Sequence, residues 1–119
     1  MSSEKRDTVD CLLDIVENAD RIARYIAAMD KAALASDSLT RDAVERCIER
    51  VCEAVFRLGE RAERLLPGHD IRDIRGMGNQ LRHAYHQIDV DIVWGVASLR
   101  LPALALDAQA LADRLQTQG

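Results

Sequence analysis

The sequence predicts an all-α protein, an antiparallel up-and-down bundle of four to five helices. Three observations predict it. Apolar residues recur at three- and four-residue steps over long stretches, the composition is rich in Ala, Leu, Arg, Asp and Glu with only two prolines, and no segment alternates apolar and polar residues for long enough to form a strand. The 119 residues fit one domain over 1–119. Since aromatic residues make up only 3%, the core must consist of aliphatic side chains.

Two long helices are expected in the first half of the chain. The first should run from about residue 5 to about residue 32 on an apolar stripe, and the polar segment 35–40 then offers several N-cap side chains. The second helix should run from there to Leu65, because Pro67–Gly68 stops it.

A pair of short helices is expected at the C-terminal end. Asp89 or Asp91 can cap a fourth helix that contains Trp94, and Pro102 should break this run. A fifth helix then extends through Leu115. The apolar fourth helix could also cover the seam of a second subunit.

The third helix begins near the good N-cap Asp70 and has three faces over residues 71–88. Its apolar face comprises Ile71, Ile74, Gly78, Leu81, Tyr85 and Ile88. The neighbouring cationic face comprises Arg72, Arg75, Asn79, Arg82, His83 and His86. Much of the third, neutral polar face consists of Asp73, Gly76, Gln80 and Gln87. Glycine within a helix is unfavourable by roughly 1 kcal/mol relative to alanine, so Gly76 and Gly78 need an explanation.

Charge and cysteine content exclude several classes of protein. A net charge of −4 argues against nonspecific nucleic-acid or membrane binding driven by overall charge, and no apolar run approaches the roughly 20 residues of a transmembrane helix. Cys11, Cys47 and Cys52 form no C-x-x-C, and no signal peptide precedes the first helix, so a reduced cytoplasmic protein is expected. Cys11 and Cys47 fall beside apolar helical positions and are interpreted as small core residues.

The cationic face suits binding or cleavage of a phosphodiester without metal or other cofactor. His83 could take the proton from a 2′-hydroxyl, and Arg82 or Arg75 could stabilise negative charge on the phosphorus centre. Asn79 and His86, with both arginines, could bind RNA or a nucleotide. Two alternatives exist: the arginines pair with acidic side chains of another helix or subunit, or His83 and His86 bind Zn²⁺, which the surrounding cations disfavour.

Tyr85 has two interpretations. Its spacing places it on the apolar face, where a mostly buried ring with its hydroxyl at the rim is expected. Alternatively, the hydroxyl reaches the cleft beside His83 and serves as a ligand or a modification site.

The pattern Gly76–Met77–x–Asn79–x–Leu81–x–His83–x–Tyr85, followed by Ile88–Asp89 and Ile92–Val93–Trp94, resembles the HepT-like branch of the HEPN domain family. The resemblance covers essentially the whole chain. It implies a homodimer with the motif helices lining one cleft, and a toxin that acts as a metal-independent endoribonuclease on cellular RNA. It also implies a partner, an MNT-type nucleotidyltransferase antitoxin, which in part of the family attaches AMP to the motif tyrosine, here Tyr85.

The chain departs from the family's ribonuclease motif, an arginine followed by four to six residues and then the histidine. The permitted places are occupied by Gly76, Met77 and Gly78, and Arg75 and Arg82 lie outside them. Two hypotheses follow. The first is a HepT-like toxin and ribonuclease, and the alternative is a catalytically weak or inactive nucleotide- or RNA-binding module that is adenylylated at Tyr85. A helical bundle without a site would leave the three-faced helix unexplained.

Overall fold

The computed structural model describes residues 1–83 and 88–118, and within these residues it contains helices and no strand. The fold is therefore all-α, as the apolar periodicity predicts. In chain order the elements are α1 (Ser3–Ile26), α2 (Lys31–Ser36), α3 (Ser38–Leu58), α4 (Arg61–Leu65), α5 (Ile71–His83), α6 (Val90–Gly95), the π-helical segment η1 (Val96–Arg100) and α7 (Leu101–Thr117).

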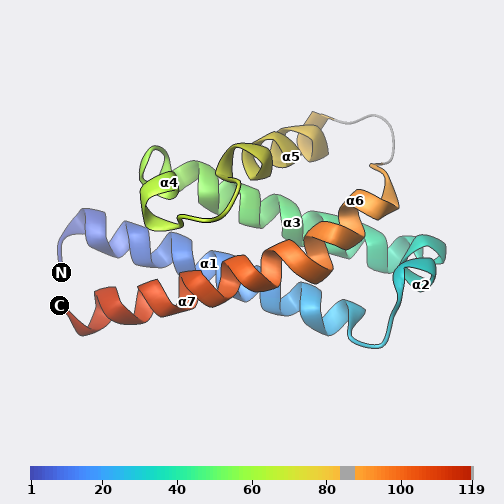
Figure 1. Cartoon of the computed structure of the whole chain (residues 1–119), viewed down its shortest axis with the longest axis horizontal. Helices are drawn as coiled ribbons and strands as arrows, with labels where there is room; N and C mark the ends of the chain where they lie inside the picture. The colour runs from blue at the N-terminus through green and yellow to red at the C-terminus, as the bar shows by residue number, and fades with distance from the viewer. Residues whose placement is uncertain (84–87, 119) are drawn as a thin grey trace.

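Four helices form the body of the molecule, which measures 46 × 29 × 22 Å (Figure 1). Helix α1 packs against both α3 and α7, and α5 packs on α3. The two chain ends lie at the same end of the bundle (Figure 1). No described helix combines the length and the low polarity that crossing a membrane requires.

Among the residues that the structure describes, the core is aliphatic, as the low aromatic content predicts. It consists of Leu, Ile, Val, Ala and Cys side chains. All three cysteines are buried and free, which confirms the interpretation of Cys11 and Cys47 as small core residues. Trp94 packs partly against this core, so much of its ring is used within the chain rather than left for a partner.

The first predicted helix is too long. Helix α1 ends at Ile26, and a separate short helix, α2, follows, because the Asp30 carboxylate accepts a hydrogen bond from the Ala33 N–H at 2.8 Å and starts a new helix. Asp37, within the predicted capping segment, caps α3 by accepting from the Thr40 N–H at 3.0 Å.

The second predicted helix is also too long. Helix α3 ends at Leu58, because Gly59 adopts a φ of +61°, a conformation that side chains with a Cβ disfavour. The residues predicted as its last turns form the separate helix α4, before Pro67–Gly68.

Both predicted caps in the second half are present. The Asp70 carboxylate accepts from the Asp73 N–H at 3.1 Å at the start of α5, and the Asp89 carboxylate accepts from the Asp91 N–H at 2.7 Å at the start of α6. The described part of α5 ends at His83, and Ile88, placed on the helix by the periodicity, is not helical.

Pro102 lies in the first turn of α7, as expected, but no loop separates α7 from the preceding helix, which corrects the expected break. Helices α6 and α7 join through η1, where the Leu101 N–H donates to the Val96 carbonyl five residues back. A proline within an α-helix lacks an N–H and its ring clashes with the carbonyl four residues earlier. The wider π turn ahead of Pro102 relieves this clash, so the helix continues.

Candidate functional site

Helix α5 carries the candidate site residues and is seated on α3 through Gly78. A Cβ at Gly78 would lie 2.5 Å from the Cys52 Cβ, so only glycine allows this close crossing. The Cys52 thiol donates a hydrogen bond to the Ile74 carbonyl at 3.2 Å, and burial raises its pKa to about 11. The position where a family arginine could stand is therefore a buried packing position.

Asn79 and His83 line one open pocket of about 480 Å³ between the end of α5 and the start of α6. Both side chains are exposed to solvent. The other lining residues are Gln80 on α5 and Ile88, Asp89 and Ile92 at and around the start of α6. The structure thus brings together the predicted histidine and asparagine and adds an amide, a carboxylate and two apolar side chains.

Arg75 is directed away from this pocket. Its guanidinium donates to the Gly59 carbonyl at 2.5 Å and to both carboxylate oxygens of Glu63 on α4. The hydrogen bond from Arg75 lowers the pKa of the Glu63 carboxyl. Arg75 therefore pairs with an acidic side chain of another helix, as one of the alternatives from the sequence proposed. This pairing and the bond to Gly59 connect α5 to α4 and to the end of α3.

Arg82 is exposed beside His83 in the chain and, within the described residues, pairs with no carboxylate. Arg82 is not among the residues that line the pocket of Asn79 and His83. Tyr85 and His86 lie outside the described residues, so the structure assigns them no place.

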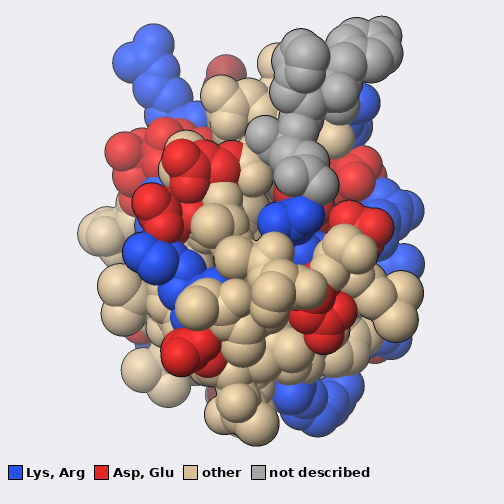
Figure 2. All heavy atoms as spheres, turned by 90° about the vertical axis from the view of Figure 1, so that its right-hand side faces the viewer, with Lys and Arg blue, Asp and Glu red and all other residues tan. Residues whose placement is uncertain are grey.

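On the end of the molecule that Figure 2 shows, acidic and basic side chains are interspersed among uncharged ones. This pattern fits the net charge of −4 and means that a polyanionic ligand would have to be held by local contacts.

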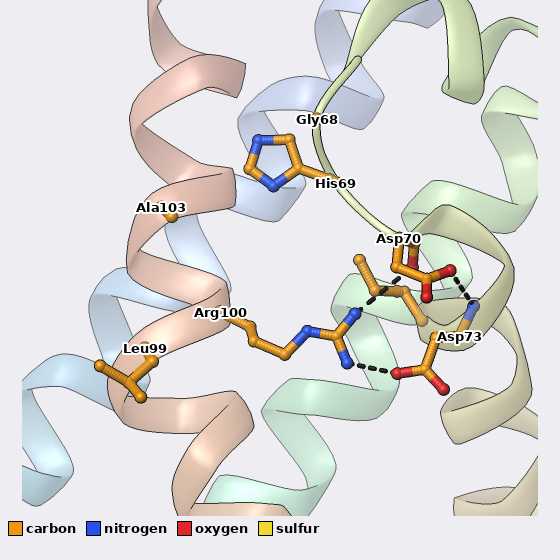
Figure 3. A pocket seen from close by; sticks show the side chains of 8 residues that line it. Gly68, His69, Asp70, Asp73, Leu99, Arg100 and Ala103 are labelled. Atoms are coloured by element: carbon orange, nitrogen blue, oxygen red, sulfur yellow. Dashed lines mark hydrogen bonds and ion pairs between the residues drawn. The ribbon is translucent and has the colours of Figure 1, made fainter.

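A second pocket, of about 460 Å³, lies between the start of α5 and the η1–α7 segment (Figure 3). His69, which the sequence reasoning did not single out, bonds through Nε2 to the Asp107 carboxylate at 2.7 Å. Arg100 bonds to the Asp73 carboxylate and, at 3.4 Å, to the Asp70 carbonyl. Because the partners stand 38 and 27 residues apart in the chain, no local pattern could reveal these pairs. These pairs fasten α5 to η1 and the segment before α5 to α7, and the Arg100 guanidinium already has an acidic partner.

The all-α bundle with Asn79 and His83 on one helix beside a pocket is consistent with the class of HEPN-like helical proteins. The comparison with protein families is more specific: the profile described as "Ribonuclease HepT-like" matches residues 15–111. The chain belongs to this HepT-like ribonuclease family.

Individual relatives agree with this assignment. The "Putative RNase MJ0125" of Methanocaldococcus jannaschii is 27% identical over 112 residues, which cover 94% of this chain and 97% of the relative. The "Probable ribonuclease HepT" of Thermococcus cleftensis is 30% identical over 100 residues, 84% of this chain and 91% of the relative. No solved structure matches the chain significantly.

Proposed function

We propose that this protein is the toxin of a HepT/MNT toxin–antitoxin pair and acts as a metal-independent endoribonuclease. The observation that carries the proposal is the shared pocket of Asn79 and His83 in a chain of the HepT-like ribonuclease family. The proposed compartment is the cytoplasm, which holds the cellular RNA and keeps thiols such as the three buried cysteines reduced.

In the proposed reaction, His83 takes the proton from a ribose 2′-hydroxyl, whose oxygen attacks the adjacent phosphorus. The bond from phosphorus to the 5′-oxygen breaks, and that oxygen takes up a proton. The products are a 2′,3′-cyclic phosphate and a 5′-hydroxyl end. Asn79 holds the ribose or a phosphate oxygen.

The cation that stabilises the phosphorus centre is proposed to be Arg82. Arg75 is held by Glu63 and the Gly59 carbonyl, whereas Arg82 is exposed and makes no ion pair within the described residues. Arg75 could serve only after releasing Glu63. His86 is proposed to bind RNA next to this site.

Homodimerisation is proposed through the continuous α6–η1–α7 helix. Three exposed large apolar side chains stand at seven-residue intervals along it, namely Ile92 (49% exposed), Leu99 (73%) and Leu106 (73%). A stripe with this spacing is typical of helix–helix association, and a two-fold axis would pair it with its own copy. Because Ile92 also lines the His83 pocket, a second copy on this stripe would border the pocket and form the dimer cleft.

Expression of the chain without a partner tests the toxin role. Growth should slow with the wild type, and His83→Ala should relieve the effect. His69→Gln is the matched control, because His69 lies at the other pocket, and it should remain toxic. If the wild type is as harmless as His83→Ala, the toxin proposal fails.

The second candidate function is an inactive nucleotide- or RNA-binding module that the MNT-type antitoxin adenylylates at Tyr85. The observation in its favour is the tight packing of Gly78 on Cys52, which leaves no room for an arginine there. Intact mass after incubation with the antitoxin and ATP tests it. One AMP added to the wild type and none to Tyr85→Phe, without RNA cleavage by the unmodified protein, would favour this candidate over the ribonuclease.

A further inference from the structure

The His83 pocket is lined by several kinds of side chain that the binding of a phosphate group alone does not require. Asn79 and Gln80 contribute side-chain amides, Asp89 contributes a carboxylate, and Ile88 and Ile92 contribute apolar surface. A carboxylate repels phosphate, so the part of the pocket near Asp89 suits another part of an RNA chain. A nucleobase is a flat ring with polar edges. It therefore fits an apolar wall that is flanked by amides and a carboxylate.

The Asp89 carboxylate is fixed in place by its own helix. Its Oδ1 accepts the Asp91 N–H at 2.7 Å as the N-cap of α6, which limits the rotation of the side chain. The other oxygen, Oδ2, accepts no hydrogen bond from the residues that the structure describes. An ionised carboxylate only accepts hydrogen bonds, and Asp89 is exposed, so this oxygen is accessible to a donor from a ligand.

His83 and Asp89 line the same pocket, and both side chains are exposed to solvent. A ligand in this pocket could therefore contact both of them. A volume of about 480 Å³ accommodates a nucleoside. A base near Asp89 with its ribose toward His83 would bring the 2′-hydroxyl to the proposed general base.

We propose that this pocket reads the base on the 5′ side of the cleaved phosphate and prefers cytosine to uracil. The inference rests on the proposed ribonuclease function and deepens it. The N4 amine of cytosine donates to the Asp89 carboxylate, whereas uracil presents a carbonyl oxygen at the same place, and two acceptors repel. Cytosine and uracil have nearly the same size, so Asp89 rather than pocket volume discriminates them.

Two RNA oligonucleotides that differ only in C or U at one position provide the test. Cleavage after C should exceed cleavage after U by about tenfold in the wild type. In Asp89→Asn the preference should fall to about twofold or less, because an amide can also donate to uracil. Asparagine caps helices as well as aspartate, so α6 should remain intact.

Asp91→Asn is the matched control. It removes the same charge two residues away, from an exposed side chain that pairs with Lys31 at 2.8 Å outside the pocket. This variant should keep the wild-type preference. Equal loss of preference in both variants would indicate a general effect of charge and would overturn the role of Asp89.

Binding of the same oligonucleotides with 2′-O-methyl groups, which block cleavage, separates the two proposals. If the wild type cuts RNA but cuts and binds C and U oligonucleotides equally, base reading is wrong and the ribonuclease stands. If the wild type binds C over U and Asp89→Asn does not, base reading stands even where no cleavage is seen.

Discussion

Two glycines of α5 stand two residues apart in opposite surroundings. Gly78 is buried, and an added Cβ would meet the Cys52 Cβ at 2.5 Å. Gly76 is exposed, and an added Cβ would have nothing within 4 Å. The first glycine is explained by packing, and nothing in the described contacts requires the second.

Alanine substitutions should therefore change stability in opposite directions. We expect Gly78→Ala to lower the free energy of unfolding by about 1–3 kcal/mol, because the contact involves a rigid Cβ close to the backbone. Gly76→Ala should raise it by about 0.5–1 kcal/mol, since glycine weakens a helix interior. Urea denaturation measures both, and a stabilising Gly78→Ala would contradict the close crossing.

An arginine at residue 76 should strengthen the proposed catalysis. Residues 76 and 83 are seven apart, about two helical turns, so their side chains project in nearly the same direction, and this spacing is one that the family motif permits. Gly76→Arg should raise the rate of RNA cleavage by about 10-fold to 100-fold, the range for one added charge-stabilising donor. Gly78→Arg is the comparison: it should unfold or strongly destabilise the protein. An unchanged rate in a folded Gly76→Arg would show that the site does not lack a cation there.

Among the helices, the crossing of α3 and α5 predicts a dependence of stability on pH. Burial raises the pKa of the Cys52 thiol from 9.0 to about 11, so the folded state favours the neutral thiol. The stabilisation is fully present below pH 9 and is lost as the pH rises through 11, because the unfolded chain releases its proton first. Between pH 8 and pH 11 the wild type should lose about 2 kcal/mol more than Cys52→Ala, as measured by urea denaturation. Equal losses would mean that the thiol is not buried in this crossing.

The elements also show how far the sequence alone could lead. Amphipathic periodicity and Asp caps predicted the all-α fold and the caps of α5 and α6, because these signals are local. The breaks at Asp30 and Gly59 were missed, since apolar spacing continues across both. The expected break at Pro102 was wrong because a π turn can accommodate a proline that a regular α-helix cannot.

The candidate site also has a part that the sequence could predict and a part that it could not. Asn79 and His83 could be placed on one face of a helix from their spacing. The contributions of Asp89 and Ile92 to their pocket, and the capture of Arg75 by Glu63, depend on tertiary packing between separate helices.

At the scale of the whole molecule, the apolar stripe on α6–η1–α7 predicts a dimer. Leu106→Glu should convert it to a monomer at micromolar concentration by light scattering, because a charge at a buried helix–helix contact lacks a partner. Leu39→Glu, at an 82% exposed residue at the start of α3, is the control and should leave the dimer intact. A monomeric wild type would refute the dimer cleft.

The most direct test of the ribonuclease proposal is RNA cleavage by purified protein in EDTA. The wild type should cut RNA and leave 2′,3′-cyclic phosphate ends, and His83→Ala should be slower by about 100-fold or more, the usual contribution of a general base. His69→Gln should cut at the wild-type rate. Cleavage that stops in EDTA, or that proceeds equally fast without His83, would contradict the proposed mechanism.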